Sequence, residues 1–145
     1  MNTVKRKSAP GRAKGAPPGL LKLFLAFAKL AERAADDRPL LRGLRIAHDA
    51  AAARFVSAHA GSYVEFLLGV PAECTPPRGE IECRRMGTGG VTEASTIARF
   101  RFGEDGVITE STVPELAGER IDQAPGACSV VAAVLWINLH PSDHE

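Results

Sequence analysis

The sequence predicts an α+β domain, and three segments carry this prediction. Across residues 19–35, apolar residues recur at three- and four-residue steps, which is the spacing of one buried helix face. Residues 96–102 instead alternate, with two phenylalanines on one side and two arginines on the other, as in a half-buried strand. Residues 80–85 alternate in the same way. One helix and several such strands within 145 residues fit a single domain of this class.

Proline and glycine residues punctuate these elements. Pro17 and Pro18 stand where a helix can begin, and Pro39 cannot continue one. The Gly-Glu-Asp-Gly sequence at residues 103–106 is typical of a turn, so residues 107–113 are expected to return as the second strand of a hairpin.

Residues 40–60 contain conflicting signals. Alanines at position 47 and at positions 50–53 favour a helix by intrinsic propensity. The Arg-Phe-Val-Ser sequence at residues 54–57 favours a strand. Composition alone predicts a helix for this segment.

Charge is unevenly distributed, although the formal net charge is only +1. Residues 1–31 hold seven bases and no acid, and the remainder holds 11 bases and 17 acids. Residues 1–16, rich in Lys, Arg, Pro, Gly and Ala, have little to bury and are expected to form a flexible basic leader. Because this leader has no interleaved aromatic side chains, a solvated tail is favoured and nucleic acid is not expected as a partner.

A membrane partner is not expected either. Lys22 and Lys29 interrupt the first apolar stretch, and the second, residues 127–139, is shorter than the roughly 20 residues that span a bilayer. Neither zinc nor redox spacing is found among the three cysteines, which are Cys74, Cys83 and Cys128. We therefore expect a cytoplasmic protein with no metal site and no cofactor.

Several segments, in the same order, resemble the SnoaL-like polyketide cyclase (ester cyclase) family. Residues 95–110 are similar to the penultimate hairpin of that family, and residues 113–118 with 123–127 to its closing segment. Residues 52–61 followed by 65–71 resemble its strand, histidine and loop. The family's one or two leading helices have no counterpart, and the basic leader stands in their place.

This resemblance implies a bent antiparallel β-sheet cone packed against one or two helices, related to the nuclear transport factor two-like and cystatin-like folds. The domain would cover residues 17–127, with residues 128–145 as a C-terminal extension. Residues 40–48 and 51–60 would be paired strands around Asp49. We further expect residues 127–139, apolar on both faces, to be a strand that adds to the sheet or joins a homodimer.

The resemblance also implies an acid–base pocket, because family cyclases close rings by aldol chemistry without a cofactor. Glu115 matches the family's acid–base aspartate and His59 its histidine, while Phe55, Phe100 and Phe102 are candidates to line the pocket. Simpler interpretations stay open for each: an exposed carboxylate at a helix N-terminus, a polar strand end, and ordinary core aromatics.

Two classes of function follow. The first is a cofactor-free cyclase or isomerase that acts by acid–base chemistry on a small apolar carbonyl compound. The second is a non-catalytic module on the same fold that binds a small apolar ligand or forms a homodimer. A mis-started reading frame with a non-functional product is a third alternative.

Overall fold

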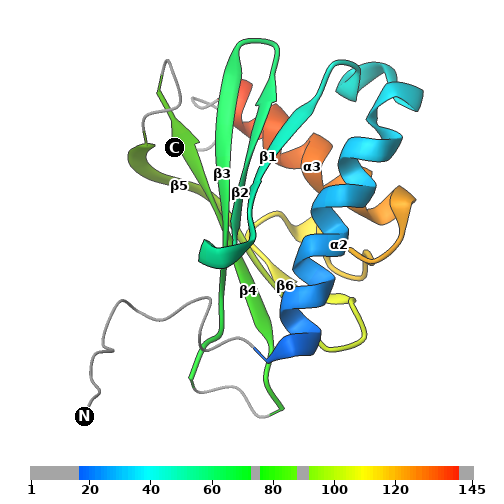
Figure 1. Ribbon diagram of the computed structural model, residues 1–145, viewed down its shortest axis with the longest axis vertical. Coiled ribbons are helices and arrows are strands. Elements are labelled where there is room, and N and C mark those ends of the chain that lie inside the picture. Colours follow the sequence, from blue (N-terminus) through cyan, green and yellow to red (C-terminus); the bar gives the residue numbers. More distant parts are fainter. Residues whose placement is uncertain (1–16, 73–75, 88–91, 141–145) are drawn as a thin grey trace.

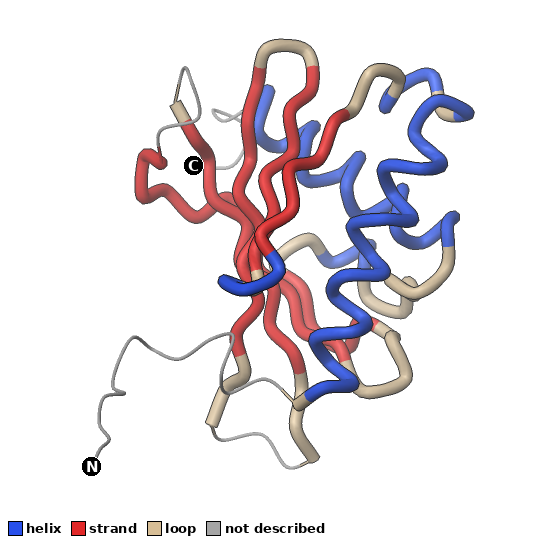
Figure 2. Tube along the Cα trace, in the orientation of Figure 1, coloured by secondary structure: helices blue, strands red, loops and turns tan. Residues whose placement is uncertain are grey.

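The computed structural model describes residues 17–72, 76–87 and 92–140. A six-stranded antiparallel sheet has the strand order β1-β2-β3-β4-β5-β6, and both long helices lie on one of its faces (Figures 1 and 2). The predicted α+β class, a bent sheet packed against helices, is confirmed. The strands are β1 (Arg45–Asp49), β2 (Arg54–His59), β3 (Ser62–Gly69), β4 (Gly79–Met86), β5 (Thr92–Phe102) and β6 (Ile108–Ser111), and the helices are α2 (Pro18–Ala34) and α3 (Ala124–Leu139).

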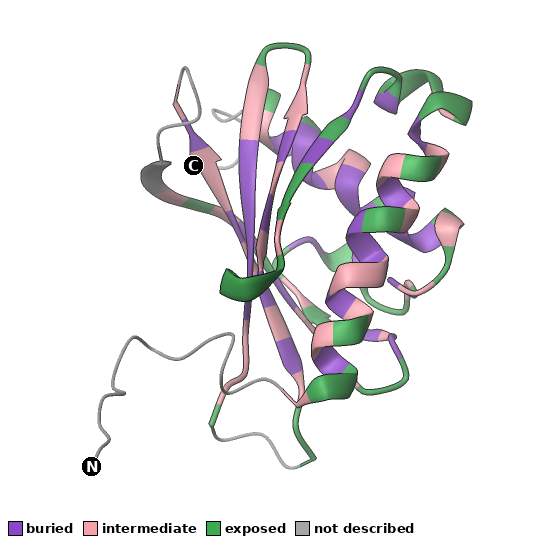
Figure 3. Ribbon diagram, in the orientation of Figure 1, coloured by how far each residue is buried: buried purple, intermediate pink, exposed green. Residues whose placement is uncertain are grey.

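The first helix of the described residues, α2, confirms the prediction for residues 19–35 to within one residue at each end. It begins directly after Pro17, because proline at the first helical position has no N–H to leave unpaired. Its apolar stripe faces the sheet (Figure 3) and is fully buried at Leu20, Phe24, Phe27, Ala28 and Ala31.

The core is built around one row of side chains that crosses four strands. Phe55, Phe66, Cys83 and Ala98 are register partners in turn, and none is more than 2% exposed. The ring of Phe27 on α2 contacts this row, with its centroid 5.7 Å from that of Phe55 and 6.1 Å from that of Phe66. Helix and sheet are therefore joined by an aromatic cluster.

Strands β1 and β2 pair around Asp49 as expected, but both are shorter than predicted. A 3-10 turn (Ala50–Ala52) occupies the start of the strand predicted at residues 51–60, because Asp49 accepts a hydrogen bond from the Ala52 N–H and Ala53 has a φ of 52°. The strand predicted at residues 40–48 is wrong in its first half, where a 3-10 turn (Pro39–Leu41) and Gly43, with a φ of 88°, precede β1.

Strand β1 forms one edge of the sheet, and Glu32 on α2 covers part of it. The Ile46 N–H donates to Glu32 Oε2 at 2.8 Å, and His48 Nε2 lies 3.7 Å from Glu32 Oε1. A carboxylate in this position occupies a backbone donor that another strand could otherwise use.

The returning strand predicted at residues 107–113 is also shorter, since β6 spans only Ile108–Ser111. A bulge between Arg101 and Phe102 disturbs its pairing with β5. Beyond it, a 3-10 turn (Pro114–Leu116) begins at a residue with no N–H to donate. The chain therefore leaves the sheet and turns toward α3.

The prediction of a strand at residues 127–139 is wrong, because these residues belong to the helix α3. Pro125 lies in the first turn of this helix, where it is tolerated, and alanine supports the helix that follows. A helix that is apolar on nearly all sides must be buried, and α3 packs against both α2 and the sheet. The helix α3 crosses the boundary expected between the domain at residues 17–127 and the C-terminal extension at residues 128–145. Among the described residues, no helix is long and apolar enough to cross a membrane.

Candidate functional site

A groove of about 440 Å³ lies between α3, β5 and the segment that follows β6. Its volume falls within the ~300–1,000 Å³ of typical small-molecule sites. The lining side chains come from three separate parts of the chain, and six of the eight residues are apolar: Ile97, Thr112, Val113, Pro114, Glu115, Ala133, Trp136 and Ile137.

Backbone irregularities position this lining. The register of β4 with β5 shifts between Cys83 and Arg84, so that Ile97 has no partner on β4. Such a bulge redirects a side chain away from regular alternation. On the opposite wall, the Val113 N–H donates to Ser111 Oγ at 2.9 Å and fixes the exit from β6.

Two of the residues that line the groove have polar side chains, Thr112 and Glu115. Glu115 is exposed in the 3-10 turn at the rim. Thr112 Oγ1 accepts a hydrogen bond from the Arg99 N–H at 3.0 Å, which leaves its hydroxyl proton available to a ligand. One carboxylate and one hydroxyl beside an apolar wall suit a ligand with an apolar body and one polar end.

The aromatic wall of the groove is Trp136, the only tryptophan of the chain. Its side chain is 50% exposed, and the His140 ring stacks on it with a centroid distance of 3.9 Å and an interplanar angle of 20°. His140 Nδ1 also lies 2.8 Å from the Trp136 carbonyl oxygen. The stacked histidine holds the last turn of α3 against the indole.

Of the two residues expected to share an acid–base pocket, only Glu115 lines this groove. His59 is half-buried at the end of β2, opposite Ser62 in the β2–β3 hairpin. Strands β3 and β4 lie between β2 and β5, so about 14 Å of sheet separate His59 from the β5 wall of the groove at ~4.8 Å per strand. The structure does not bring the two residues together.

The three phenylalanines expected to line a ligand pocket lie in the core instead. Phe55, Phe100 and Phe102 are each at most 1% exposed. The Phe55 ring stacks on Phe66 with a centroid distance of 4.5 Å. Phe102 covers Gly79 so closely that a Cβ at that glycine would lie 2.3 Å from the ring. These three rings therefore belong to the hydrophobic core and do not line the groove.

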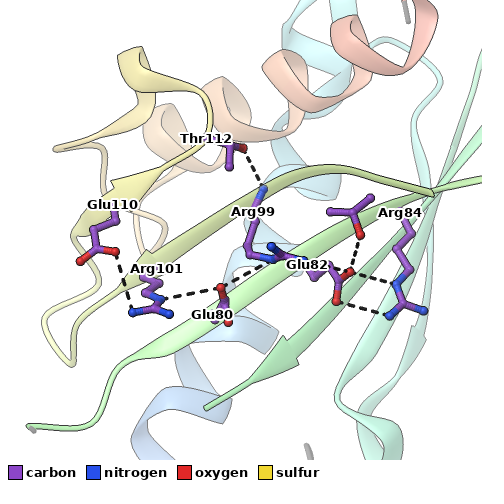
Figure 4. Close-up of polar contacts among 8 residues, drawn as sticks. Glu80, Glu82, Arg84, Arg99, Arg101, Glu110 and Thr112 are labelled. Carbon is purple, nitrogen blue, oxygen red and sulfur yellow. Dashed lines mark hydrogen bonds and ion pairs between the residues drawn. The ribbon is translucent and has the colours of Figure 1, made fainter. Parts of the chain in front are cut away.

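The sheet face away from the helices carries a network of ion pairs across β4, β5 and β6 (Figure 4). Arg99 lies within 3.7 Å of both Glu80 and Glu82, and Arg101 bridges Glu80 and Glu110 at 3.7 and 3.8 Å. Since acids and bases alternate between neighbouring strands, the charges compensate one another locally.

Glu82 is the most enclosed carboxylate of this network. It accepts hydrogen bonds from the Thr96 hydroxyl and from Arg84 Nε. Burial raises the pKa of Glu82, but these hydrogen bonds and the charges of Arg84 and Arg99 outweigh it and leave the pKa below its ordinary value. A carboxylate ionised so firmly is a poor proton shuttle near neutral pH.

Glu82 leads to a prediction about acid stability. As the pH falls through the ordinary value of 4.5, the unfolded chain binds a proton before the folded protein does, and stability is lost down to the lowered pKa. Glu82→Gln can still accept from Thr96 but does not titrate. We expect urea denaturation to show a steeper loss of stability in the wild type than in Glu82→Gln between about pH 5 and pH 3. Equal slopes would contradict the lowered pKa.

The two described cysteines are unsuited to catalysis. Cys83 and Cys128 are free and buried. Burial raises the pKa of both thiols, well above the ordinary value for Cys83, so neither is a reactive thiolate. Cys74 lies outside the described residues. Within the described ranges, no group of three His, Cys, Asp or Glu side chains could hold a metal ion.

Sequence reasoning found Glu115 but missed the rest of the groove. The signal that could have revealed it is the single tryptophan within an apolar run, because tryptophan combines a large apolar surface with an N–H group and is enriched at binding surfaces. Searches against protein-family models, curated proteins and solved structures found no match to this chain. The resemblance to ester cyclases therefore remains a prediction from the sequence.

Proposed function

We propose that the protein is a small-ligand-binding module whose ligand occupies the groove beside Trp136. The observation that carries this proposal is a groove of about 440 Å³ whose eight lining residues include six apolar ones and a single carboxylate, that of Glu115 at the rim. An aromatic or aliphatic ligand would pack on the indole, and an amine or another donor group would meet the carboxylate. The ligand class is thus a small, mainly apolar molecule with a basic end.

Two observations favour binding over acid–base catalysis. Glu115 is exposed to water at the rim of the groove, whereas catalytic groups usually work in a site that excludes water. The expected proton donor, His59, lies several strands away. A cofactor-free cyclase or isomerase remains the second proposal, supported by Glu115 and the Thr112 hydroxyl in one groove.

Trp136 reports directly on the groove, because no other tryptophan contributes to the fluorescence. We expect naphthylamine-type probes to quench or shift the Trp136 emission, with an effect that saturates as the probe concentration rises. Naphthyl carboxylates of the same size should bind more weakly. Glu115→Gln should weaken amine binding about five- to tenfold, since a charge-assisted hydrogen bond is lost. Glu104→Gln, which removes an exposed carboxylate from the β5–β6 turn, is the control and should change nothing.

A Trp136 emission that responds to none of these probes would contradict the binding proposal. Homodimerisation would then be the alternative, because the sheet face opposite the helices is covered by no described element (Figure 1). Sedimentation at high micromolar concentration distinguishes the two, and a chemical turnover abolished by Glu115→Gln would favour the cyclase proposal.

A further inference from the structure

The strand β1 lies at one edge of the sheet, and β2 is its only strand neighbour among the described residues (Figure 1). The Ile46 N–H points away from β2, because it donates to Glu32 Oε2 at 2.8 Å. Backbone groups alternate along an antiparallel strand, so the N–H and C=O groups of His48 also point to the open edge. An edge of this kind is a template for pairing with a further strand.

The backbone of β1 can pair with a second copy of itself. In an antiparallel pair with a two-fold axis at Ala47, Ile46 of each copy lies opposite His48 of the other. Both residues direct their N–H and C=O groups to the edge, so each opposed pair exchanges two backbone hydrogen bonds. Ala47 is exposed and small, which suits the axis, where the two Cα atoms approach to about 4.5 Å.

The charges of β1 are complementary in the same register. Arg45 and Asp49 lie on the outer face of the sheet with Ala47, and the two-fold axis places Arg45 of each copy opposite Asp49 of the other. Arg45 is exposed and has no ion pair with any described residue. Asp49 lies 3.6 Å from Arg54, yet its side chain remains 47% exposed. A second copy therefore supplies the carboxylate that Arg45 lacks.

Glu32 on α2 stands in the way of such pairing. Its carboxylate accepts from the Ile46 N–H and also lies 3.7 Å from His48 Nε2, so it contacts both residues whose backbone faces the edge. An arriving strand has to displace this carboxylate before the Ile46 N–H can bond a carbonyl group.

We propose that β1 is a homodimer edge that Glu32 holds closed, in which two copies pair antiparallel about Ala47. The contact between Glu32 and β1 is then autoinhibitory. A second copy fits better than an unrelated peptide, because it brings a base and an acid in the register that Asp49 and Arg45 require. Strands β2, β3 and β4 lie between β1 and the β5 wall of the groove, so this inference does not depend on ligand binding there.

Glu32→Ala opens the edge and should allow dimerisation at concentrations at least about tenfold lower than the wild type requires, since a charge-assisted hydrogen bond no longer competes. Sedimentation velocity over a concentration series measures this shift, and thermal melts verify that each variant is folded. Glu104→Ala, which removes an exposed carboxylate from the β5–β6 turn, is the control and should sediment as the wild type does. A Glu32→Ala protein that sediments as the wild type does at every concentration would overturn the proposal.

A charge exchange tests the register. Glu32→Ala/Arg45→Glu and Glu32→Ala/Asp49→Arg should each be monomeric, because like charges then face each other across the two-fold axis. A mixture of the two should form heterodimers, since every acid again faces a base. Dimers of Glu32→Ala that neither substitution weakens would rule out this register.

A disulfide tests the pairing with Glu32 in place. Ala47→Cys/Cys74→Ser should form a disulfide between two copies on mild oxidation, because a Cα separation of about 4.5 Å permits that bond. Adding Glu32→Ala should speed its formation at least about tenfold. Ala51→Cys/Cys74→Ser, with the new thiol at an equally exposed alanine outside β1, is the control and should cross-link no faster with Glu32→Ala. Equal rates at the two positions would contradict pairing through β1.

Discussion

Phe55→Ala is expected to lower the free energy of unfolding by about 3–5 kcal/mol, the usual cost of truncating a buried phenylalanine. The ring is 1% exposed, stacks on Phe66, and has its centroid within 5.7 Å of those of Phe24 and Phe27. Its removal leaves a cavity where α2 meets the sheet, and the neighbouring rings lose their contacts. Chemical denaturation followed by circular dichroism measures this loss.

The control for Phe55→Ala is Leu40→Ala, which truncates an exposed apolar side chain and should change stability by less than about 0.5 kcal/mol. A Phe55→Ala protein within about 1 kcal/mol of the wild type would show that the ring does not support a closed core. The interpretation of Phe55 as a ligand-lining residue would then return.

Gly126→Ala should destabilise the protein by about 3 kcal/mol or more, at the upper end of overpacking effects. A Cβ at this position would lie 2.0 Å from the Arg120 carbonyl oxygen and 2.9 Å from the Arg120 nitrogen. These are backbone atoms, so no side-chain rotation relieves the overlap, and the first turn of α3 must shift. Thermal and urea unfolding both measure the effect.

Gly19→Ala provides the comparison for Gly126→Ala, because nothing lies within 4 Å of a Cβ built at Gly19. Alanine in a helix is favoured over glycine by roughly 0.5–1 kcal/mol, so this variant should be neutral or slightly more stable. Similar stability of both variants would mean that α3 does not approach Arg120 as closely as described.

The parts of the fold that the sequence predicts well are those with a clear period. The helix at residues 19–35 and the strands at residues 80–85 and 96–102 each bury one face, and a half-buried element reveals itself by that spacing. The sequence does not distinguish the helix α3 from a strand, because α3 is apolar on nearly every side. Neither the period of a helix nor the alternation of a strand is then visible in the pattern of apolar residues. For strand β2 the local residues conflict, because Arg-Phe-Val-Ser favours a strand and the preceding alanines favour a helix, and the family resemblance decides for the strand.

The candidate site was less predictable. Glu115 was identified, but its neighbours depend on a bulge that leaves Ile97 unpaired and on a strand that ends at Ser111. Neither feature has a local signature in the sequence, because both arise from how three strands fit together. The separation of His59 from Glu115 is unpredictable for the same reason, since it depends on the strand order.

The order of elements along the chain has a consequence for synthesis. Each strand pairs with the next one made, so the sheet can form from local contacts as the chain grows. The two helices that pack together come from opposite ends of the described chain, and α3 is the last element. Until residues 124–139 have been translated, part of the apolar face of the sheet has no cover. A nascent chain would therefore pass through a stage in which it is prone to aggregation and is a substrate for chaperones.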